Sequence, residues 1–438
     1  MEKKFGKQSF TVLLLFGLIG QIAWTVENMY FNLFVFDTIQ QNLNAITLMV
    51  QLSGVAATAV TLVAGALSDK LGNRRSFISI GYIIWGITVL LFGFISPNLM
   101  EIIFGMQHEN AVKAALVTVI IGDCVMTLFG STANDAAFSA WVTDNTAPSY
   151  RGKIESIVSI LPLFAMLIVA GGFGIIVEAI GYTAVFAMLG IIISASGVFG
   201  IFYIKDSDSL EKSGTLRDML YGFTPSSVKA NKPFYITLII TCLYGIACQI
   251  FMPYLIIYMK TYLGFSVIEY SVVFGAAIIV GALINLFLGK LSDKKNKAYA
   301  IYSATAIFSL GLLSMYFAKG MTHTATLIFF GISGFVMITG YIFIAALTGA
   351  IVRDHTPPSA TGKLQGVRMI FCVLIPMLAG PSIGNAINKG MGIPLPGGGA
   401  DTMTTLFIPA PEIFLAAAIT SLIIFAVTPV LIKLTSNK

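Results

Sequence analysis

The chain has 438 residues, of which 57% are hydrophobic and 11% charged, and its formal net charge is +6. Soluble domains carry about 25% charged residues, so a water-soluble fold of this length would need more charged surface than the sequence supplies. The mean hydropathy is +0.88. This composition excludes soluble enzymes and disordered proteins, and it predicts a protein that crosses a membrane many times. The positive charge then indicates cytoplasmic loops rather than nucleic-acid binding.

Twelve apolar runs, each of about the length needed to span a bilayer, follow one another along the chain. Six come before a polar stretch at 205–233 and six after it. They lie at about 10–37, 45–67, 76–96, 114–142, 154–177, 181–204, 234–259, 267–289, 298–317, 324–352, 366–388 and 411–433. We therefore expect an all-α membrane protein of twelve helices, with six-helix bundles at 1–204 and 234–438 joined by a cytoplasmic central loop.

The lysines and arginines predict the orientation of the chain. If the N-terminus is inside, all but four of the 26 basic residues fall in cytoplasmic segments; the four are Lys113, Lys260, Lys319 and Lys389. Cytoplasmic loops are enriched in Lys and Arg. Both termini are therefore expected in the cytoplasm, with the protein in the plasma membrane.

Two motifs occur twice. Gly65-Ala-Leu-Ser-Asp69-Lys after the second run recurs as Gly289-Lys-Leu-Ser-Asp293-Lys after the eighth, and Asp144-x-Thr-x-Pro-x-x-x-Gly-Lys recurs from Asp354. Matches at equivalent places in two halves of the same orientation indicate duplication about an axis along the membrane normal, which places a substrate cleft between the halves.

The charged residues in and near these motifs predict a cytoplasmic gate, in which ion pairs hold the inner side closed and break as the halves rock. The alternative is that they only orient the chain. The gate residues are expected to be Asp69, Arg74, Arg75, Asp144, Arg151, Asp293 and Asp354.

The stretch Gly65-Ala-Leu-Ser-Asp69-Lys-Leu-Gly-Asn-Arg74-Arg75 resembles the loop signature of the major facilitator superfamily. Asn134-Asp135-Ala-Ala-Phe-Ser-Ala-Trp141, followed by Asp144 and Arg151, is similar to the glycoside–pentoside–hexuronide:cation symporters of the melibiose permease type. The resemblance implies cation-coupled sugar transport, with Asp135 in place of the aspartate that serves the cation and sugar sites. The acid pair that this family carries on its second helix is absent here.

Polar side chains on one face of the first run are candidates for substrate binding. Gln21, Thr25, Asn28 and Asn32 fall within about 60° on a helix, and Trp24 and Phe31 flank them. Amides beside aromatic faces suit a sugar, although amides also join helices without any ligand. The seventh run, the counterpart of the first, adds Tyr244, Gln249 and Tyr254.

Glu27, Asp123 and Asp135 lie within apolar runs and are candidates for cation coupling. A charge there is costly, so each should be protonated, paired or hydrated. On a regular α-helix Asp123 and Asp135 point about 120° apart, so we expect Asp135 to act with Glu27 or the amides of the first run. A single carboxylate suits a proton better than sodium.

The sequence thus predicts a secondary transporter of a small polar solute, most consistent with a sugar or glycoside, driven by H⁺ in preference to Na⁺. A superfamily exporter or carrier of a lipid-like solute is the alternative. An intramembrane enzyme fits poorly, because His108, His323 and His355 are far apart and the usual nucleophile and metal motifs are absent. We expect a monomer in the bilayer, with no metal site, no organic cofactor and no nucleic-acid partner.

Overall fold

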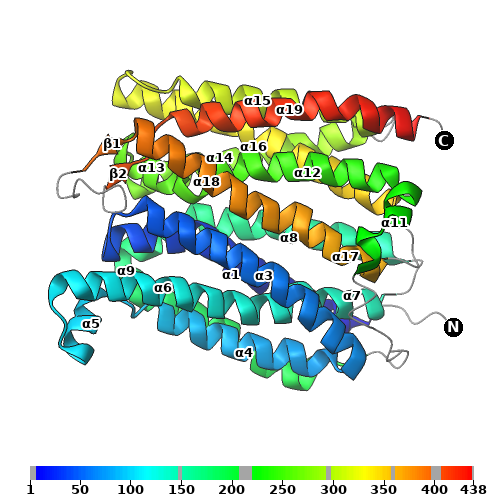
Figure 1. Ribbon diagram of the computed structural model, residues 1–438, viewed down its shortest axis with the longest axis horizontal. Helices are drawn as coiled ribbons and strands as arrows, with labels where there is room; N and C mark the ends of the chain where they lie inside the picture. The colour runs from blue at the N-terminus through cyan, green and yellow to red at the C-terminus, as the bar shows by residue number, and fades with distance from the viewer. Residues whose placement is uncertain are drawn as a thin grey trace. The chain divides into compact units, whose positions relative to one another are not determined.

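The computed structural model describes residues 6–146, 150–206, 220–292, 297–356, 361–395 and 406–436. Over these ranges the chain is helical apart from one short antiparallel ribbon (Figure 1). Eleven helical segments are long and apolar enough to cross a membrane. The predicted all-α polytopic fold is therefore confirmed.

The chain divides into two compact units, which are described separately here. The first contains residues 1–40 and 55–218, and the second contains residues 41–54 and 219–438.

Several helices of the first unit change their hydrogen-bond pattern partway along. The element α1 continues through η1 and η2, and α6 continues through η3, and each of these three inserts is a π-helix. The elements are α1 (Lys7–Val26), η1 (Glu27–Phe31), α2 (Asn32–Phe34), η2 (Val35–Ile39), α3 (Leu43–Leu71), α4 (Arg74–Phe92), α5 (Pro97–Phe104), α6 (His108–Gly130), η3 (Ser131–Phe138), α7 (Ser139–Asp144), α8 (Arg151–Ile168), η5 (Val169–Phe173) and α9 (Gly174–Tyr203).

One apolar segment, Ile157–Tyr203, is 47 residues long. At 1.5 Å per residue it would extend about 70 Å as a single helix, more than twice the roughly 30 Å of a hydrocarbon core. The chain breaks inside α9 at Gly181, whose φ of 80° belongs to the left-handed region that glycine adopts without a Cβ clash. This break coincides with the boundary between the fifth and sixth apolar runs of the sequence.

The second unit begins with short helices and ends with the ribbon and a long helix. Its elements are η6 (Leu220–Phe223), α11 (Pro225–Ala230), α12 (Lys232–Phe251), η7 (Met252–Tyr254), α13 (Leu255–Thr261), α14 (Val267–Ser292), α15 (Lys297–Tyr316), α16 (His323–Asp354), α17 (Thr361–Met369), η9 (Ile370–Leu374), α18 (Ile375–Met391), β1 (Ile393–Pro394), β2 (Phe407–Ile408) and α19 (Glu412–Thr435). Strand β1 pairs antiparallel with β2.

The first turns of α3 belong to the second unit, whereas the rest of that helix belongs to the first. The hydroxyls of Thr47 and Tyr254 are 2.7 Å apart, and Nε2 of Gln51 donates to Oγ of Ser382 at 2.6 Å. Polar bonds thus hold residues 41–54 against η7 and α18, an attachment that the sequence boundaries at 204 and 234 do not indicate.

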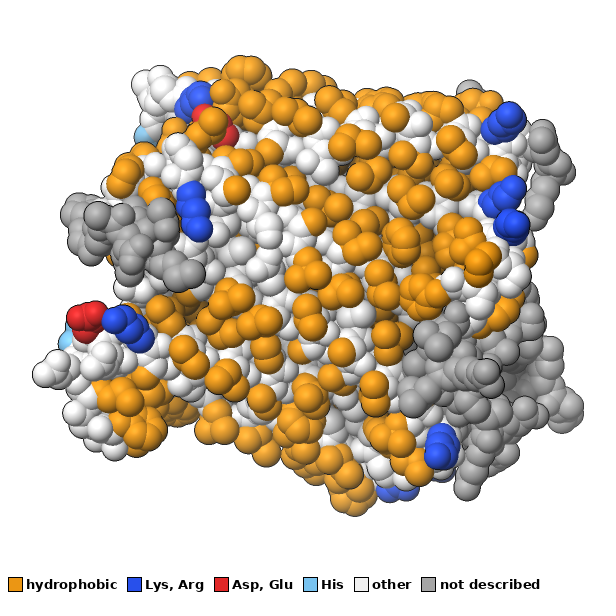
Figure 2. Space-filling model, viewed as in Figure 1, with side chains coloured by type: hydrophobic (Ala, Val, Ile, Leu, Met, Phe, Trp, Pro, Cys, Tyr) orange, Lys and Arg blue, Asp and Glu red, His pale blue; other side chains and the backbone are white. Residues whose placement is uncertain are grey.

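The helices present hydrophobic side chains outward along their length. In Figure 2 these side chains cover the middle of the visible face, and Lys, Arg, Asp and Glu gather at the helix ends. Ile80 on α4 is 53% exposed and Leu283 on α14 is 54% exposed. Such a surface suits lipid, and the polar groups of the backbone are satisfied inside the helices as a bilayer requires.

Candidate functional site

A chain of buried hydrogen bonds centred on Asn134 links three helical segments of the first unit. Nε1 of Trp24 donates to Oδ1 of Asn134 at 3.3 Å, and Nδ2 of Asn134 donates to the Tyr82 hydroxyl at 2.6 Å. The Tyr82 hydroxyl in turn donates to the carbonyl of Phe16 at 2.8 Å. Segments α1, α4 and η3 are therefore joined by polar groups that have partners, as a low-dielectric interior demands.

The close approach behind this chain depends on Gly20. A methyl group on Gly20 would lie 2.2 Å from Nδ2 of Asn134 and 2.7 Å from the Tyr82 hydroxyl. Only a residue without a side chain leaves room there for both groups.

Asp135 lies beside this chain and is only half-buried, although it sits within a membrane-capable segment. Oγ of Ser131 donates to Oδ2 of Asp135 at 2.9 Å. The carboxylate is therefore held by a neighbouring hydroxyl and remains partly accessible.

Glu27 is buried where α1 gives way to the π-helix η1, and Oγ1 of Thr127 donates to its Oε1 at 3.1 Å. Asp123, which is 2% exposed, lies one turn earlier than Thr127 on α6. Asp123, Thr127, Ser131 and Asp135 follow one another at intervals of four residues. Oxygen-bearing side chains therefore recur on every turn between the two aspartates.

The π-helix η3 changes the geometry expected for these acids. The angle of 120° between Asp123 and Asp135 assumes a regular α-helix, but residues 131–138 have the wider π-helical turn. The structure bonds Asp135 to Ser131 and joins Trp24 of α1 to the adjacent Asn134. Glu27 bonds to Thr127.

The predicted polar face of the first run is divided by η1. Asn28 is exposed, whereas Asn32 is 1% exposed. Their amide nitrogens donate to the carbonyls of Trp24 and Asn28 at 2.7 and 2.9 Å, and Thr25 donates to the carbonyl of Gln21 at 2.7 Å. The two asparagines thus do not share one environment, because the π-helical turn alters the register between them.

The two predicted aromatic flanks also differ. Trp24 is half-buried and packs on Trp85, with 4.9 Å between ring centroids. Phe31 is 1% exposed and stacks on Phe92 at 4.1 Å. Of these two aromatic residues, Trp24 belongs to the polar cluster that Trp24, Asn134, Tyr82 and Asp135 form. Phe31 belongs to the aromatic packing of the first unit.

The candidates of the seventh run lie in the second unit. The Tyr244 hydroxyl donates to the carbonyl of Tyr341 at 3.2 Å, and that of Tyr254 donates to the carbonyl of Pro381 at 3.1 Å. Gln249 is half-buried, with its Cβ beside Gly380. The two tyrosines therefore hold helices together in this conformation.

Asp144 and Asp354, which are equivalent in the repeated motif, each form an ion pair within their own unit. Nε of Arg74 is 3.1 Å from Oδ2 of Asp144, and Nζ of Lys297 is 2.7 Å from Oδ2 of Asp354. The first pair joins the start of α4 to the end of α7, and the second joins the start of α15 to the end of α16, so each pair braces its own unit.

Of the other predicted gate residues, Arg75 receives a partner that the sequence does not indicate, since its backbone N–H donates to Asp206 at 3.0 Å. The side chains of Asp69 and Arg151, and the whole of Asp293, lie outside the described part of the chain.

Sequence reasoning missed Tyr82, Thr127, Ser131 and Lys297. The spacing of Thr127 and Ser131 relative to the two aspartates was a readable signal. Tyr82 gave none, because one tyrosine in an apolar run is not distinguishable from a packing residue.

Comparison with known proteins shows which family the sequence matches. The model of the Major Facilitator Superfamily matches residues 13–381. The chain is 22% identical over 328 residues to the probable sulfoacetate transporter SauU of Cupriavidus necator, a match that covers 70% of this chain and 69% of that protein.

Among solved structures, the nucleoside transporter NupG matches with a TM-score of 0.63 at 14% identity, over 97% of this chain and 98% of its own. A bacterial homologue of the human lysosomal transporter Spinster matches with a TM-score of 0.66 at 14% identity, over 97% and 96%. At these identities the likeness shows a shared fold.

Proposed function

We propose that this chain, which belongs to the major facilitator superfamily, is a proton-coupled secondary transporter of a small neutral polar solute of the sugar or glycoside class. The family and its transporter relatives point to a transport protein and not to an enzyme. The observation that carries the finer proposal is the polar cluster of the first unit, where Asp135 lies beside the Trp24–Asn134–Tyr82 chain.

The coupling ion is a proton in this proposal. Asp135 is half-buried and accepts one hydroxyl hydrogen bond from Ser131. A proton needs only one carboxylate, whereas a hard metal cation in a protein is held by several oxygen ligands. Protonation also removes the cost of a charge inside the membrane while the carrier changes conformation.

The charges of the spans favour a neutral solute. The segments Lys7–Ile39 and His108–Asp144 hold Glu27, Asp123 and Asp135 in their interiors, and their lysines lie close to their starts. An anion would be repelled by any of these acids that is ionised, whereas hydroxyl groups can bond to amide and indole groups such as those of Asn134 and Trp24.

The remaining parts of the proposal follow from the sequence. The 47-residue segment counts as two crossings, which gives twelve. Both termini are cytoplasmic, the membrane is the plasma membrane, and the protein acts as a monomer by alternating access. Within the superfamily, the chain is assigned to the glycoside–pentoside–hexuronide:cation symporters, because the stretch around Asp135 resembles theirs.

The test is Asp135→Asn in proteoliposomes. We expect this variant to lose solute accumulation driven by a pH gradient while solute exchange persists, because the amide retains the shape of the site but cannot carry the proton. Glu178→Gln makes the same chemical change at an exposed position of α9 and should leave accumulation unchanged. Uphill accumulation by Asp135→Asn would show that this residue is not needed for coupling. Stimulation of wild-type uptake by Na⁺ at constant pH would overturn the proposal that the coupling ion is a proton.

A second candidate is a small organic anion that enters with cations. It is favoured by the name of the SauU relative and by Arg368, which is exposed at the end of α17. Parallel uptake of labelled sugars and sulfoacetate separates the two candidates. Uptake of sulfoacetate alone, lost in Arg368→Gln, would replace the sugar proposal, and transport of lysolipid alone would support the lipid-carrier alternative.

A further inference from the structure

A row of residues on the first turns of α3 contacts η7 and α18. The row repeats at intervals of three and four residues and consists of Asn44, Thr47, Gln51 and Gly54. Side chains at this spacing share one face of a helix. We call this row the α3 seam. It lies entirely in the part of α3 that belongs to the second unit, and that part ends at Gly54.

Amide side chains bond the α3 seam to α18. Nδ2 of Asn385 donates to Oδ1 of Asn44 at 2.9 Å. Nε2 of Gln51 donates to Oγ of Ser382 at 2.6 Å and to the carbonyl of Leu378 at 2.9 Å. Both amides of the α3 seam therefore have partners on the same neighbouring helix.

The other two residues of the α3 seam pack closely against the second unit. The hydroxyls of Thr47 and Tyr254 are 2.7 Å apart, and the Tyr254 hydroxyl also donates to the carbonyl of Pro381 at 3.1 Å. A methyl group on Gly54 would lie 2.7 Å from Cβ of Met377. The α3 seam is thus in contact along its whole length.

The second half of the sequence does not repeat the α3 seam. The offset that relates Asp69 to Asp293 places two isoleucines, one serine and one glycine at the equivalent positions of α14, which are Ile268, Ser271, Gly275 and Ile278. Neither amide recurs, and α14 belongs wholly to the second unit. The α3 seam is therefore a feature of the first half alone and not part of the duplicated scaffold.

The bonds of the α3 seam join uncharged groups. Asn44 and Asn385 are half-buried and Ser382 is exposed, whereas Thr47 and Tyr254 are 6% and 0% exposed. Water can replace a neutral partner at small net cost, and no charge is left unpaired in the interior when such a bond breaks. These bonds can therefore break and form again.

The division of α3 between the two units requires one part of it to move. The helix is continuous from Leu43 to Leu71, yet its first turns belong to the second unit and the rest to the first. In alternating access, which the proposed function involves, one bundle moves against the other. Bending α3 at the boundary would break backbone hydrogen bonds in apolar surroundings, which is costly, whereas opening the α3 seam breaks uncharged side-chain bonds.

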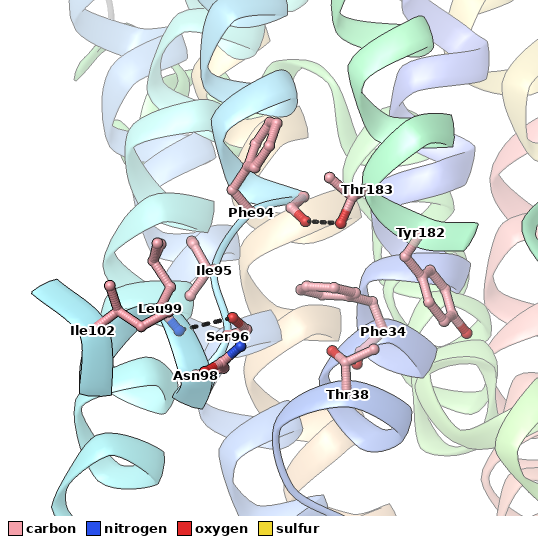
Figure 3. A pocket seen from close by; sticks show the side chains of 11 residues that line it. Phe34, Thr38, Phe94, Ile95, Ser96, Asn98, Leu99, Ile102, Tyr182 and Thr183 are labelled. Atoms are coloured by element: carbon pink, nitrogen blue, oxygen red, sulfur yellow. Dashed lines mark hydrogen bonds between the residues drawn. The ribbon is translucent and has the colours of Figure 1, made fainter. Parts of the chain in front are cut away.

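Space for such a movement lies beside the segment that leads into α3. A cavity of about 420 Å³ in the first unit separates Phe34 and Thr38 from Ile95 and Asn98 (Figure 3). Protein interiors hold few voids larger than a water molecule. Because only residues 40–42 connect η2 to α3, a shift of η2 into this cavity can accompany the opening of the α3 seam.

We propose that the α3 seam is a releasable latch, which is closed in this conformation and opens once in each transport cycle. The proposal rests on the proposed transport by alternating access. With the orientation predicted from the basic residues, α3 begins on the outer side, so the latch closes the outer end of the transport path. The second half has no equivalent row on α14, so the latch acts on one side of the pseudo-symmetric pair.

A reversible cross-link tests whether the latch must open. Asn44→Cys and Asn385→Cys, in a background without the native cysteines, are joined by a bifunctional methanethiosulfonate in proteoliposomes. The linked protein should lose both exchange and gradient-driven uptake of the labelled sugar or sulfoacetate that the unlinked protein transports, because the α3 seam cannot open. Dithiothreitol should restore both activities.

The matched control is Lys319→Cys with Glu412→Cys, whose native side chains are 3.5 Å apart within the second unit. Linked by the same reagent, this variant should transport at its unlinked rate. Undiminished transport by the linked variant of Asn44 and Asn385 would overturn the latch.

Spin labels test the latch without a transport assay. Cysteines for labelling replace Leu48 on α3 and Ile383 on α18, which are 46% and 38% exposed. Double electron–electron resonance of the full chain in nanodiscs should give two distances, and Thr47→Val should enrich the longer one. Labels at Ile328 and Ile383, both in the second unit, should give one distance.

The two readouts separate this proposal from the proposed function. A single distance between Leu48 and Ile383 that Thr47→Val leaves unchanged would overturn the latch, whatever the protein transports. Two distances in a protein that takes up no sugar, or takes it up without protons, would support the latch and reject only the proposed function.

Discussion

Asn134 shows how a single side chain can organise a polar site within apolar helices. Its amide uses the carbonyl oxygen toward Trp24 and the nitrogen toward Tyr82, so one residue joins α1 to α4 through η3. Leaving such a buried group without a partner costs about 1–3 kcal/mol. The position of Asp135, one residue further along, depends on this arrangement.

Gly20→Ala tests that arrangement. The added methyl group must displace Asn134 or Tyr82, because it would lie 2.2 Å and 2.7 Å from their polar atoms. We expect a net loss of about 1–2 kcal/mol, since the broken hydrogen bonds outweigh the roughly 1 kcal/mol that alanine adds to helix propensity. Thermal unfolding in detergent measures the loss, and solute affinity should fall with it.

Gly334→Ala is the matched control, because nothing lies within 4 Å of the added methyl group in the middle of α16. This variant should be as stable as the wild type or more so. If both variants unfold at the same temperature, the close packing around Gly20 is not as described.

The site could be predicted from the sequence only in part. Acids inside apolar runs are visible in a sequence, and Asp135 is half-buried within a membrane-capable segment. The partners of Asp135 and Asn134 were not visible, because Tyr82 comes from another helix and long-range contacts leave no local pattern. Whether these residues bind solute or proton stays a prediction.

At the scale of the element, the π-helical segments explain why the side chains of the first run, predicted to share one face, lie in different surroundings. A π-helix hydrogen-bonds to the fifth residue back and widens the turn, and it leaves carbonyls for side chains to satisfy. Asn28 and Asn32 donate to such carbonyls in and around η1, and Ser139 donates to the carbonyl of Asn134 at 3.3 Å after η3. Neither segment contains the proline or glycine that would have indicated a break.

The two duplicated ion pairs differ in burial, and this difference gives a prediction. Arg74 and Asp144 have side chains 5% and 28% exposed, whereas Lys297 and Asp354 are 32% and 49% exposed. Asp144→Asn should cost about 1–3 kcal/mol, because it takes the carboxylate from a buried guanidinium. Asp354→Asn should cost about 0–1 kcal/mol, as exposed pairs do.

The pair of variants forms its own control, since each makes the same substitution at the equivalent place in one half. Chemical unfolding in detergent with increasing salt distinguishes them further, because only the exposed pair is screened strongly. Equal losses for both variants would show that the duplicated pairs have equivalent surroundings.

At the scale of the whole molecule, the fold was largely readable from hydropathy. Most of the predicted runs correspond to single helices, for example 298–317 to α15 and 411–433 to α19. Helix α5, which directly follows the run at 76–96, was not predicted, because an eight-residue helix is too short to show a hydrophobic period. The grouping of residues 41–54 with the second unit was also missed, because hydropathy carries no information on which helices pack together.

The orientation of the molecule in the membrane is the remaining whole-molecule prediction, and it rests on the basic residues alone. The only basic residues outside the expected cytoplasmic segments are Lys113, Lys260, Lys319 and Lys389, so the positive-inside rule places residues 205–233 inside and the 394–399 stretch outside.

Cysteine labelling in intact cells tests this orientation. The background must lack the native cysteines, of which Cys372 is exposed. Gly398→Cys, in the stretch expected outside, should react with an impermeant maleimide. Ser213→Cys, in the central loop, should react only after the membrane is permeabilised, a step that also shows that both thiols are reactive. The reverse pattern would place both termini outside and would overturn the predicted orientation.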